Sequence, residues 1–364
     1  GSLKSSRFNR IYRASNDYNA PFTTLVTSDT TVILNNLEQN TYYEVYVSAL
    51  CGAGDTSAER YTSFQSGLHR TERIYVKQGA NGNYDGTSWN NAYGYVSQAV
   101  EDAHRQHEIY GHHPEVWVAQ GTYTPMNTWN SLTSLPSDVY LYGGFVGNET
   151  SFSQRPQPGT PEFPHSILDC QNNNSNVVYQ DGYYTDEHQS IIDGFIIQNG
   201  YTGADLRSGA TIRNCIIRNN KRGLSLYGDQ SLGRVHVDHC QVINNSDQWN
   251  DAGIRANHAV IDNTLIAGNS TENGESSGLY LLNNVTVRHC DIVGNIVNNT
   301  TSTNNIHGVF VNGFNDTLIN CIVWGNVNSS NSTLSQISPS DQLTSLHSAS
   351  ADTLNGTGNI QQIY

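Results

Sequence analysis

The sequence predicts a mostly β protein whose larger, C-terminal part is built from stacked coils. Six copies of one phrase, typified by TIRNCIIRNN at residues 211–220, recur at intervals of 21 to 31 residues. A period of this length is typical of solenoids. Asn, Ser, Thr, Gly and Tyr are abundant, whereas Lys and Met are scarce, which favours strands and turns over helices.

The charge of the chain excludes some partners. Its formal net charge is −14 over 364 residues, which argues against nucleic acid or an anionic membrane, since both require clustered Lys and Arg. No apolar run reaches the roughly 18 residues of a membrane span. We expect a monomer, and Gly1-Ser2 reads as an expression scar on a segment trimmed at both ends.

The first segment, residues 1–66, contains a hairpin-like pattern. TVILNNLEQNTYYEVYVSALC alternates apolar and polar residues on either side of a turn. The spacing L-x-x-x-T-x-Y-x-V-x-V-x-A, from Leu37 to Ala49, resembles the corner between the fifth and sixth strands of a fibronectin type III domain. The resemblance implies that Tyr43 is the corner tyrosine. Too few residues precede the motif to supply the first two strands, so we expect a truncated module that acts as a spacer.

The next segment, residues 67–165, is predicted to be a cap region. It begins with a strand at IYV and continues with Val96, Ala99, Val100 and Ala103, whose spacing predicts one amphipathic helix. Between them, Asn81, Asn83, Asp85 and Gly86 imitate the start of an EF-hand loop. The twelfth position, which requires a bidentate Glu, is Ala92, so an ordinary turn is favoured over calcium.

Several phrases in this region carry a family resemblance. GANGNYDGTSWNNA, VWVAQGTYTP, VYLYGGFVGNET and ILDC together resemble the start of a right-handed single-stranded parallel β-helix of the pectate-lyase-like superfamily, of the type found in secreted and surface proteins of Bacteroidetes. The resemblance covers residues 74–364. Together with the first segment, it implies an all-β chain in which the truncated sandwich is followed by a β-helix over residues 67–364. The regular coils occupy 166–364, and the short helix covers the exposed edge of the first strand.

Aligning the copies gives columns with distinct roles. The centres are Gly194, Cys215, Cys240, Thr264, Cys290 and Cys321. The residues three before the centre (Ile191, Ile212, Val237, Ile261, Val287, Leu318) and two after it are all aliphatic, so both columns are predicted to point inward. Five residues after the centre stand Asn199, Asn220, Asn245, Asn269, Asn295 and Asn326, which predicts an asparagine ladder between coils.

The column just before the centre predicts a bend in every coil. It holds Asp193, Asn214, His239, Asn263, His289 and Asn320, residue types that accept a left-handed backbone. His239 and His289 are therefore interpreted as bend residues rather than catalytic groups. The adjoining cysteines are expected to be small buried side chains with free thiols; disulfides, or a role in metal binding or catalysis, stay open as alternatives. Two residues before the centre, the pattern predicts charge pairs between Arg213 and Asp238 and between Asp262 and Arg288.

A second recurring phrase, Gly followed by alternating apolar residues, predicts another strand in each coil. Its outward column is Asp205, Ser225, Arg255, Tyr280 and Phe310, and the loops before it vary in length. Loops of uneven length on one side of a regular scaffold are the expected functional surface. In the superfamily that the chain resembles, extended polysaccharides lie on this side. The predicted ligand-binding residues are Trp249, Tyr280, Phe310, Asp247, Glu272 and Glu275.

Two functional classes remain open at this point. The first is a secreted or cell-surface protein, extracellular or on a bacterial surface, that binds an extracellular polysaccharide or a host glycan without catalysis. The second is a polysaccharide lyase or glycoside hydrolase acting on an acidic glycan, with Arg255, Asp251 and Asp205 as the candidate catalytic residues. A lyase of this superfamily uses carboxylate-bound calcium, so calcium stays open as a cofactor, although no metal ligands are assigned.

The distribution of basic residues favours the second class. Six of the 18 Lys and Arg residues, Arg207, Arg213, Arg218, Lys221, Arg222 and Arg234, fall within 28 positions and predict a basic patch for an anionic chain. The absence of a catalytic signature in the sequence and the aromatic outward column favour the first.

Overall fold

The computed structural model separates the chain into two units, Gly1–Arg70 and Thr71–Tyr364. The structure describes residues 7–14, 22–28, 34, 42–50, 57–65, 70–127, 131–180, 182, 189–249, 251–298, 307–328, 336–338, 340–352 and 354–361. Within these ranges, no helix has the length and apolar character needed to cross a membrane.

The described part of the first unit is one antiparallel sheet. Its strands are β1 (Arg7–Ala14), β2 (Thr23–Thr27), β3 (Tyr42–Leu50) and β4 (Arg60–Gln65), in the order β2-β1-β3-β4. Tyr43, the predicted corner tyrosine, is buried at the start of β3. Leu37 and Thr41, which carry part of the motif, and Cys51 lie outside the described residues. The fibronectin type III assignment therefore stays a prediction.

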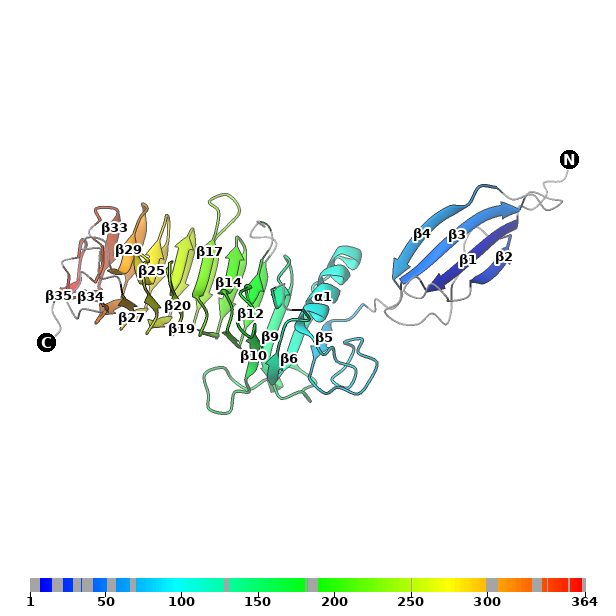
Figure 1. Cartoon of the computed structure of the whole chain (residues 1–364), viewed down its shortest axis with the longest axis horizontal. Helices are drawn as coiled ribbons and strands as arrows, with labels where there is room; N and C mark the ends of the chain where they lie inside the picture. Colours follow the sequence, from blue (N-terminus) through cyan, green and yellow to red (C-terminus); the bar gives the residue numbers. More distant parts are fainter. Residues whose placement is uncertain are drawn as a thin grey trace. The chain divides into compact units, whose positions relative to one another are not determined.

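The second unit is a parallel β-helix, in which each coil contributes strands to sheets that run along the axis (Figure 1). The first sheet contains β5 (Arg73–Val76), β6 (Glu115–Ala119), β9 (Tyr140–Phe145), β12 (Ser190–Asp193), β15 (Ala210–Arg213), β18 (Val235–Asp238), β22 (Ala259–Asp262), β26 (Thr286–Arg288), β30 (Asp316–Ile319) and β33 (Leu343–Leu346). The second sheet contains β7 (Gly121–Tyr123), β10 (Ser166–Asp169), β13 (Phe195–Gln198), β16 (Ile216–Arg218), β19 (Gln241–Ile243), β23 (Leu265–Ala267), β27 (Asp291–Val293), β31 (Ile322–Trp324), β34 (Ala349–Ser350) and β35 (Ile360–Gln361).

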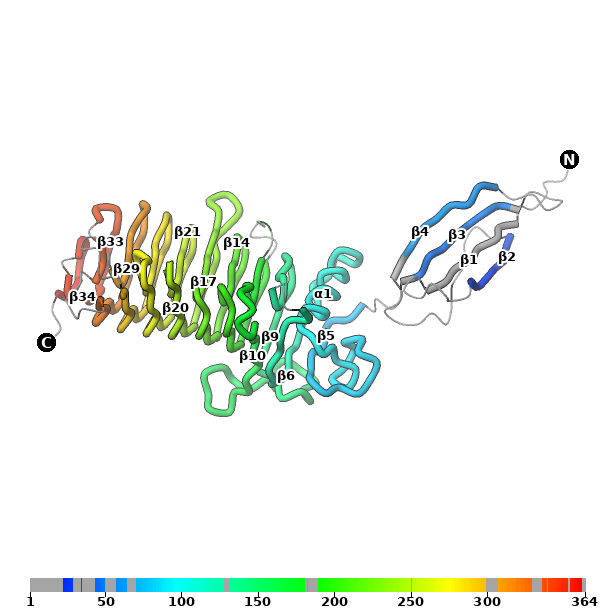
Figure 2. The backbone as a smooth tube through the Cα atoms, in the orientation of Figure 1, coloured from blue at the N-terminus to red at the C-terminus, as the bar shows by residue number. Residues whose placement is uncertain are grey.

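The variable side of the coils carries two further sheets. The third sheet contains β8 (Thr133–Ser134), β11 (Val178–Tyr179), β14 (Thr202–Arg207), β17 (Arg222–Tyr227), β21 (Ile254–Asn257), β25 (Ser276–Leu281) and β29 (His307–Val311). A fourth, short sheet contains β20 (Ser246–Asp247), β24 (Ser270–Thr271), β28 (Ile296–Val297) and β32 (Val327–Asn328). Figure 2 shows the coils stacked in sequence order from β5 to β34.

The predicted inward columns form the core, with one correction in the first copy. From Ile212 onward the register joins Val237, Ile261, Val287 and Leu318, and all five are buried. Ile212, however, pairs with Ile192 and not with Ile191. The predicted alignment of the first copy is therefore wrong by one residue.

The same shift changes the central column and the bend. Gly194 (φ 82°) takes the bend position that was assigned to Asp193, in line with Asn214, His239, Asn263, His289 and Asn320, whose φ angles lie between 49° and 53°. His239 and His289 are bend residues, as predicted. Phe195 then occupies the cysteine column, and its backbone N–H points at Cys215 Sγ. The large ring fits because Gly143, on the neighbouring coil, has no side chain to collide with it.

The cysteines of the described region are free and buried. They are Cys170, Cys215, Cys240, Cys290 and Cys321. The thiols of Cys215 and Cys290 donate to backbone carbonyls, of Arg213 and Arg288 respectively, at 3.1 Å. The prediction of free thiols is confirmed for the four cysteines of the central column, Cys215, Cys240, Cys290 and Cys321.

The asparagine ladder is present and starts one coil later than predicted, at Asn220 instead of Asn199. Nδ2 of each ladder residue donates to Oδ1 of the next, at 2.9 to 3.1 Å, through Asn220, Asn245, Asn269, Asn295 and Asn326. Asn326 then donates to Gln336 at 3.0 Å. Asn199 is not part of the ladder, because the shifted register gives it a left-handed backbone (φ 60°) and turns its amide toward Asp169.

One of the two predicted charge pairs forms. Arg288 binds Asp262 through two hydrogen bonds of 2.6 Å. Arg213 does not bind Asp238; it donates to Asp193 at 2.7 Å, since the corrected register places Asp193 in the same column. Burial alone would raise the pKa of Asp193, but hydrogen bonds from Arg155, Asn214 and Arg213 hold it below its usual range.

The cap region contains the predicted helix, α1 (Val96–Tyr110), which packs against β5, β6 and β8. Val96, Ala99, Val100 and Ala103 are the buried apolar residues of this helix, and Gly111, with a φ of 64°, ends it. A single 3₁₀ turn follows at Phe152–Gln154. In the EF-hand-like segment, Asp85 accepts hydrogen bonds from the backbone and hydroxyl of Thr87, as in an ordinary turn.

Candidate functional site

The outward column predicted for the third sheet is present and longer than expected. The strand register places in one row Tyr179, Asp205, Ser225, Arg255, Tyr280 and Phe310, from β11 to β29. Figure 1 shows these strands side by side along the axis. The sequence pattern missed Tyr179, because no recurring glycine precedes β11. We call this set the outward row.

Arg255 is the centre of the row and has two partners. Its Nη1 donates to Oδ2 of Asp251 at 3.1 Å, and its guanidinium carbon lies 4.4 Å from the centre of the Tyr280 ring. Asp251 is buried, and its other oxygen accepts the backbone N–H of Ser276 at 3.3 Å. Burial raises the pKa of Asp251 to about 6, against the opposing effect of Arg255 and of Arg222.

Asp205 has a guanidinium partner of its own. It forms an ion pair with Arg207, two residues along β14. Burial raises the pKa of Asp205, and the charges of Arg207 and Arg222 lower it. Arg222 donates to the backbone carbonyl of Asp251 at 3.2 Å, so its charge acts on both carboxylates. The three predicted catalytic residues, Arg255, Asp251 and Asp205, therefore belong to one network of alternating charge.

The aromatic residues of the row pack against each other and against the arginines. The rings of Tyr280 and Phe310 lie 5.2 Å apart at 44°. Tyr280 is only 4% exposed, and its hydroxyl accepts a hydrogen bond from Asn312 at 2.7 Å. Because Arg255 lies over the ring, Tyr280 does not offer an open face to a ligand, contrary to the expectation from sequence.

The loops before the row differ in exposure. Trp249 is 67% exposed, the highest value among the large hydrophobic side chains of the described residues. Asp247 is buried and accepts the backbone N–H of Trp249 at 2.8 Å, so it shapes the turn that presents the indole. Glu272 and Glu275 are exposed. Trp249 and Asp251 are two positions apart, so their Cα atoms lie within about 7 Å of each other.

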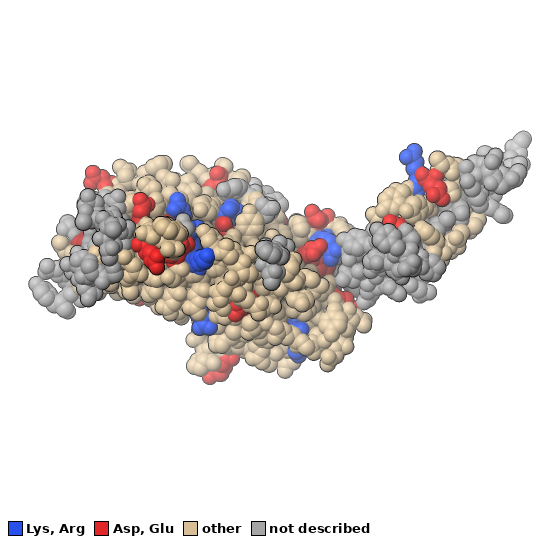
Figure 3. Space-filling model, viewed as in Figure 1, with Lys and Arg blue, Asp and Glu red and all other residues tan. Residues whose placement is uncertain are grey.

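The six basic residues do not form the predicted patch. Arg213 lies on β15 in the first sheet and Arg218 on β16 in the second, whereas Arg207 and Arg222 lie on the third. Sheets of a coil face different directions, so closeness in sequence does not bring these charges together. On the face shown in Figure 3, basic and acidic side chains are interspersed.

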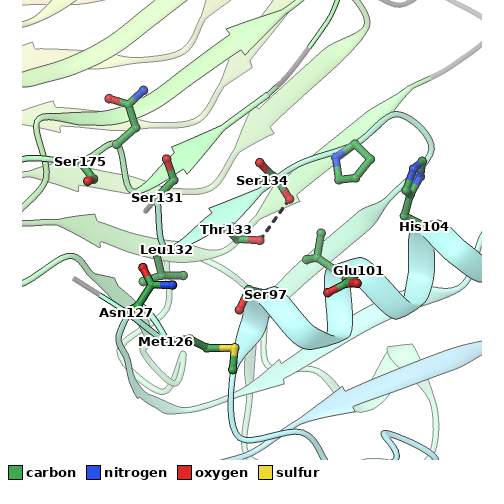
Figure 4. Close-up of a pocket in the computed structure, with 13 residues that line it drawn as sticks. Ser97, Glu101, His104, Met126, Asn127, Ser131, Leu132, Thr133, Ser134 and Ser175 are labelled. Carbon is green, nitrogen blue, oxygen red and sulfur yellow. Dashed lines mark hydrogen bonds between the residues drawn. The ribbon is translucent and has the colours of Figure 1, made fainter. Parts of the chain in front are cut away.

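Two cavities have no residue of the outward row in their lining, although one of them borders its end, since its Ser134 pairs with Tyr179. One of about 820 Å³ is lined by Ser97, Glu101 and His104 of α1 and by Thr133 and Ser134 of β8 (Figure 4). Another, of about 500 Å³, is lined by Phe163, His165 and the bend residues Asn214 and His239. Neither contains a residue that the sequence assigned to ligand binding or catalysis.

Comparisons with known proteins identify no family. No model of a known protein family and no curated protein matches the chain. Among solved structures, the chain is similar to a family 28 exopolygalacturonase from Yersinia enterocolitica, with 10% sequence identity, coverage of 94% of this chain and 86% of that one, and a TM-score of 0.21. A similarity at this level does not bear on the activity of this chain.

Proposed function

We propose that this chain binds an extended polysaccharide, outside the cell or on a bacterial surface, through the outward row and the loops beside it. The observation that carries the proposal is the exposed indole of Trp249, two residues from a carboxylate that is bound to Arg255. An exposed indole can stack on a sugar ring, while guanidinium and carboxylate groups bond to hydroxyls. The strand spacing of about 4.8 Å places the residues of the outward row at regular intervals along the axis.

The pairing of the charged groups favours binding without catalysis. Asp251 is bound to Arg255 and Asp205 to Arg207, so each carboxylate has a guanidinium partner already in place. Such pairs hold their side chains in fixed positions, which suits recognition of a repeating polymer. An extracellular polysaccharide or a host glycan is the proposed partner.

The first unit supports an extracellular location. Its antiparallel order β2-β1-β3-β4 fits the larger sheet of an immunoglobulin-like sandwich, in which strands C′, C, F and G lie in that order. We assign this unit as a truncated fibronectin type III module that acts as a spacer. Proteins that combine such a module with a β-helix in this way would belong to the Bacteroidetes surface type that the sequence resembles.

One observation favours hydrolysis as a second candidate function. A carboxyl group whose pKa is raised to about 6, like that of Asp251, has the property required of a general acid in glycoside hydrolysis. Asp205 would then supply the second carboxylate. A lyase would instead use Arg255 as the base, with calcium held by the same carboxylates.

A panel of neutral and uronate polysaccharides separates these functions. The chain is run through affinity gels with calcium, and parallel samples are followed for new reducing ends and for ultraviolet absorbance of unsaturated sugars. Binding predicts retention by one polysaccharide, weakened at least about tenfold by Trp249→Ala. Phe314→Ala, which removes another exposed aromatic ring outside the row, should leave retention unchanged.

The other possible results would either establish an enzyme or contradict the proposed binding surface. Products that appear with the native chain and vanish with Asp251→Asn would establish the enzyme. No retention and no product across the panel would contradict both functions, and equal losses for Trp249→Ala and Phe314→Ala would contradict the assigned surface.

A further inference from the structure

A cluster of two histidines and one aspartate lies where the cap helix ends. His107 is in the last turn of α1, and the backbone N–H of Gly111 donates to the carbonyl of His107 at 2.7 Å as the chain turns back. His113 follows directly, and its ring stacks on that of His107 with centres 4.5 Å apart and an angle of 27°. The turn at the end of the helix therefore brings two imidazoles to one place.

Asp138 brings a carboxylate to the same place from the next coil. It lies in the turn before β9, is 2% exposed and has a left-handed backbone (φ 64°). Its backbone N–H donates to the carbonyl of Gln189 at 3.1 Å, which fixes the turn. A left-handed conformation is unfavourable for residues with a side chain, so the turn is held by its surroundings.

The nitrogen–oxygen distances within the cluster are close to those between the ligands of one metal ion, and His113 Nδ1 also lies 3.4 Å from the backbone carbonyl oxygen of Asp138. His107 Nε2 lies 3.4 Å from Asp138 Oδ2, and His113 Nδ1 lies 3.6 Å from Asp138 Oδ1. Charge-assisted hydrogen bonds close to about 2.7 to 2.9 Å. Ligand atoms at about 2.0 to 2.1 Å from a tetrahedral zinc ion stand about 3.4 Å from each other, which is the spacing seen here.

We propose that His107, His113 and Asp138 bind one divalent transition-metal ion of the zinc class, with a fourth position open to water or another ligand. Within the described residues, this is the one group of three or more His, Cys, Asp and Glu side chains whose ligand atoms lie within 4.8 Å of one another. Two nitrogens and one carboxylate oxygen suit zinc, cobalt, nickel or copper better than calcium or magnesium.

The position of the site gives the ion a structural effect. His107 belongs to α1, His113 to the turn before β6, and Asp138 to the turn before β9. One ion would therefore join the cap helix to two strands of the first sheet. Because the ion binds the folded arrangement, it raises the thermal midpoint of the chain.

The test is metal titration of the full chain without an affinity tag, after treatment with a chelator. Zn²⁺ binding is measured by calorimetry, and Co²⁺ binding by its visible absorption, which is intense only in tetrahedral sites. We expect one equivalent of each ion and a higher thermal midpoint. Asp138→Asn, which keeps a residue tolerant of the left-handed backbone, and His113→Ala should each weaken binding at least about 100-fold.

His104→Ala is the matched control. His104 lies one turn earlier on α1, where its Nε2 is 3.6 Å from Glu108 Oε1, and it is outside the cluster. This variant should keep the bound equivalent. Absence of stoichiometric binding by the native chain, a cobalt spectrum without tetrahedral intensity, or an equal loss in His104→Ala would overturn the proposal. If a variant fails to fold, the stoichiometry and cobalt spectrum of the native chain decide.

Discussion

Replacing Asn269 by Ala tests the contribution of the asparagine ladder to the β-helix. Asn269 is fully buried in the middle of the ladder. Its Oδ1 accepts the backbone N–H of Asn245 at 3.0 Å, and its Nδ2 donates to the carbonyl of Val242 at 2.9 Å. Water cannot replace the lost amide at a fully buried position, so the variant deprives both backbone groups of a partner.

The magnitude follows from the number of groups left without that partner. Each buried polar group that loses its hydrogen bond costs about 1 to 3 kcal/mol, so two of them lower the free energy of unfolding by about 2 to 6 kcal/mol. The matched control is Asn273→Ala in the same coil. Asn273 is exposed, and its side chain donates to the Gln248 carbonyl at 3.0 Å, so its loss should cost less than about 1 kcal/mol.

The assay is urea unfolding followed by circular dichroism, with amide hydrogen exchange of the two coils that flank the substitution. Coils of a solenoid contact only their neighbours, so the loss of protection should be largest in those two coils. If Asn269→Ala and Asn273→Ala unfold at the same urea concentration, the ladder does not stabilise the stack in the way described.

Two further predictions follow from buried titratable groups. Asp316 has one oxygen bonded to the Val285 N–H and the other buried without a partner in the described part of the chain, and burial raises its pKa to about 6. The folded-state pKa of Asp316 exceeds the unfolded value, so the stability contributed by this residue is lost as pH rises from about 4 to 6. The Asp316→Asn variant should therefore have a higher thermal midpoint than the native chain at pH 8 and the same midpoint near pH 4. A constant difference between the two midpoints at all pH values would contradict this. The five described buried cysteines should resist a thiol reagent in the folded chain and react after unfolding. Mass spectrometry of labelled peptides measures this difference. Labelling of Cys215 or Cys240 under native conditions would contradict the prediction and show that the coil opens.

Much of the β-helix could be predicted because its columns repeat. Aliphatic residues, asparagines and left-handed bends recur at fixed offsets, and each offset corresponds to one position in a coil. The first copy is ambiguous in sequence because Asp193 and Gly194 both suit a bend, and because Phe195 is larger than the other members of its column. The space for its ring is made by Gly143, which lies 52 positions earlier in the chain.

The candidate sites were less accessible to sequence reasoning for physical reasons. The pattern placed Arg255 and Tyr280 in one outward row, yet it could not show that the guanidinium lies over the ring, since that depends on side-chain packing. The His107, His113 and Asp138 cluster follows no repeat. It forms only because the helix end and the turn before β9 meet in space.

The fixed spacing within each coil has a consequence for engineering. The bend and the ladder residue are six positions apart in each of these coils, from Asn214 and Asn220 to Asn320 and Asn326. The next glycine follows the ladder residue by three positions at Asn220 and Gly223, and by thirteen at Asn295 and Gly308. Foreign peptides inserted into this stretch should therefore lie at regular intervals along the axis without shifting the neighbouring coils. The β-helix could thus serve as a scaffold that holds added segments at chosen distances from one another.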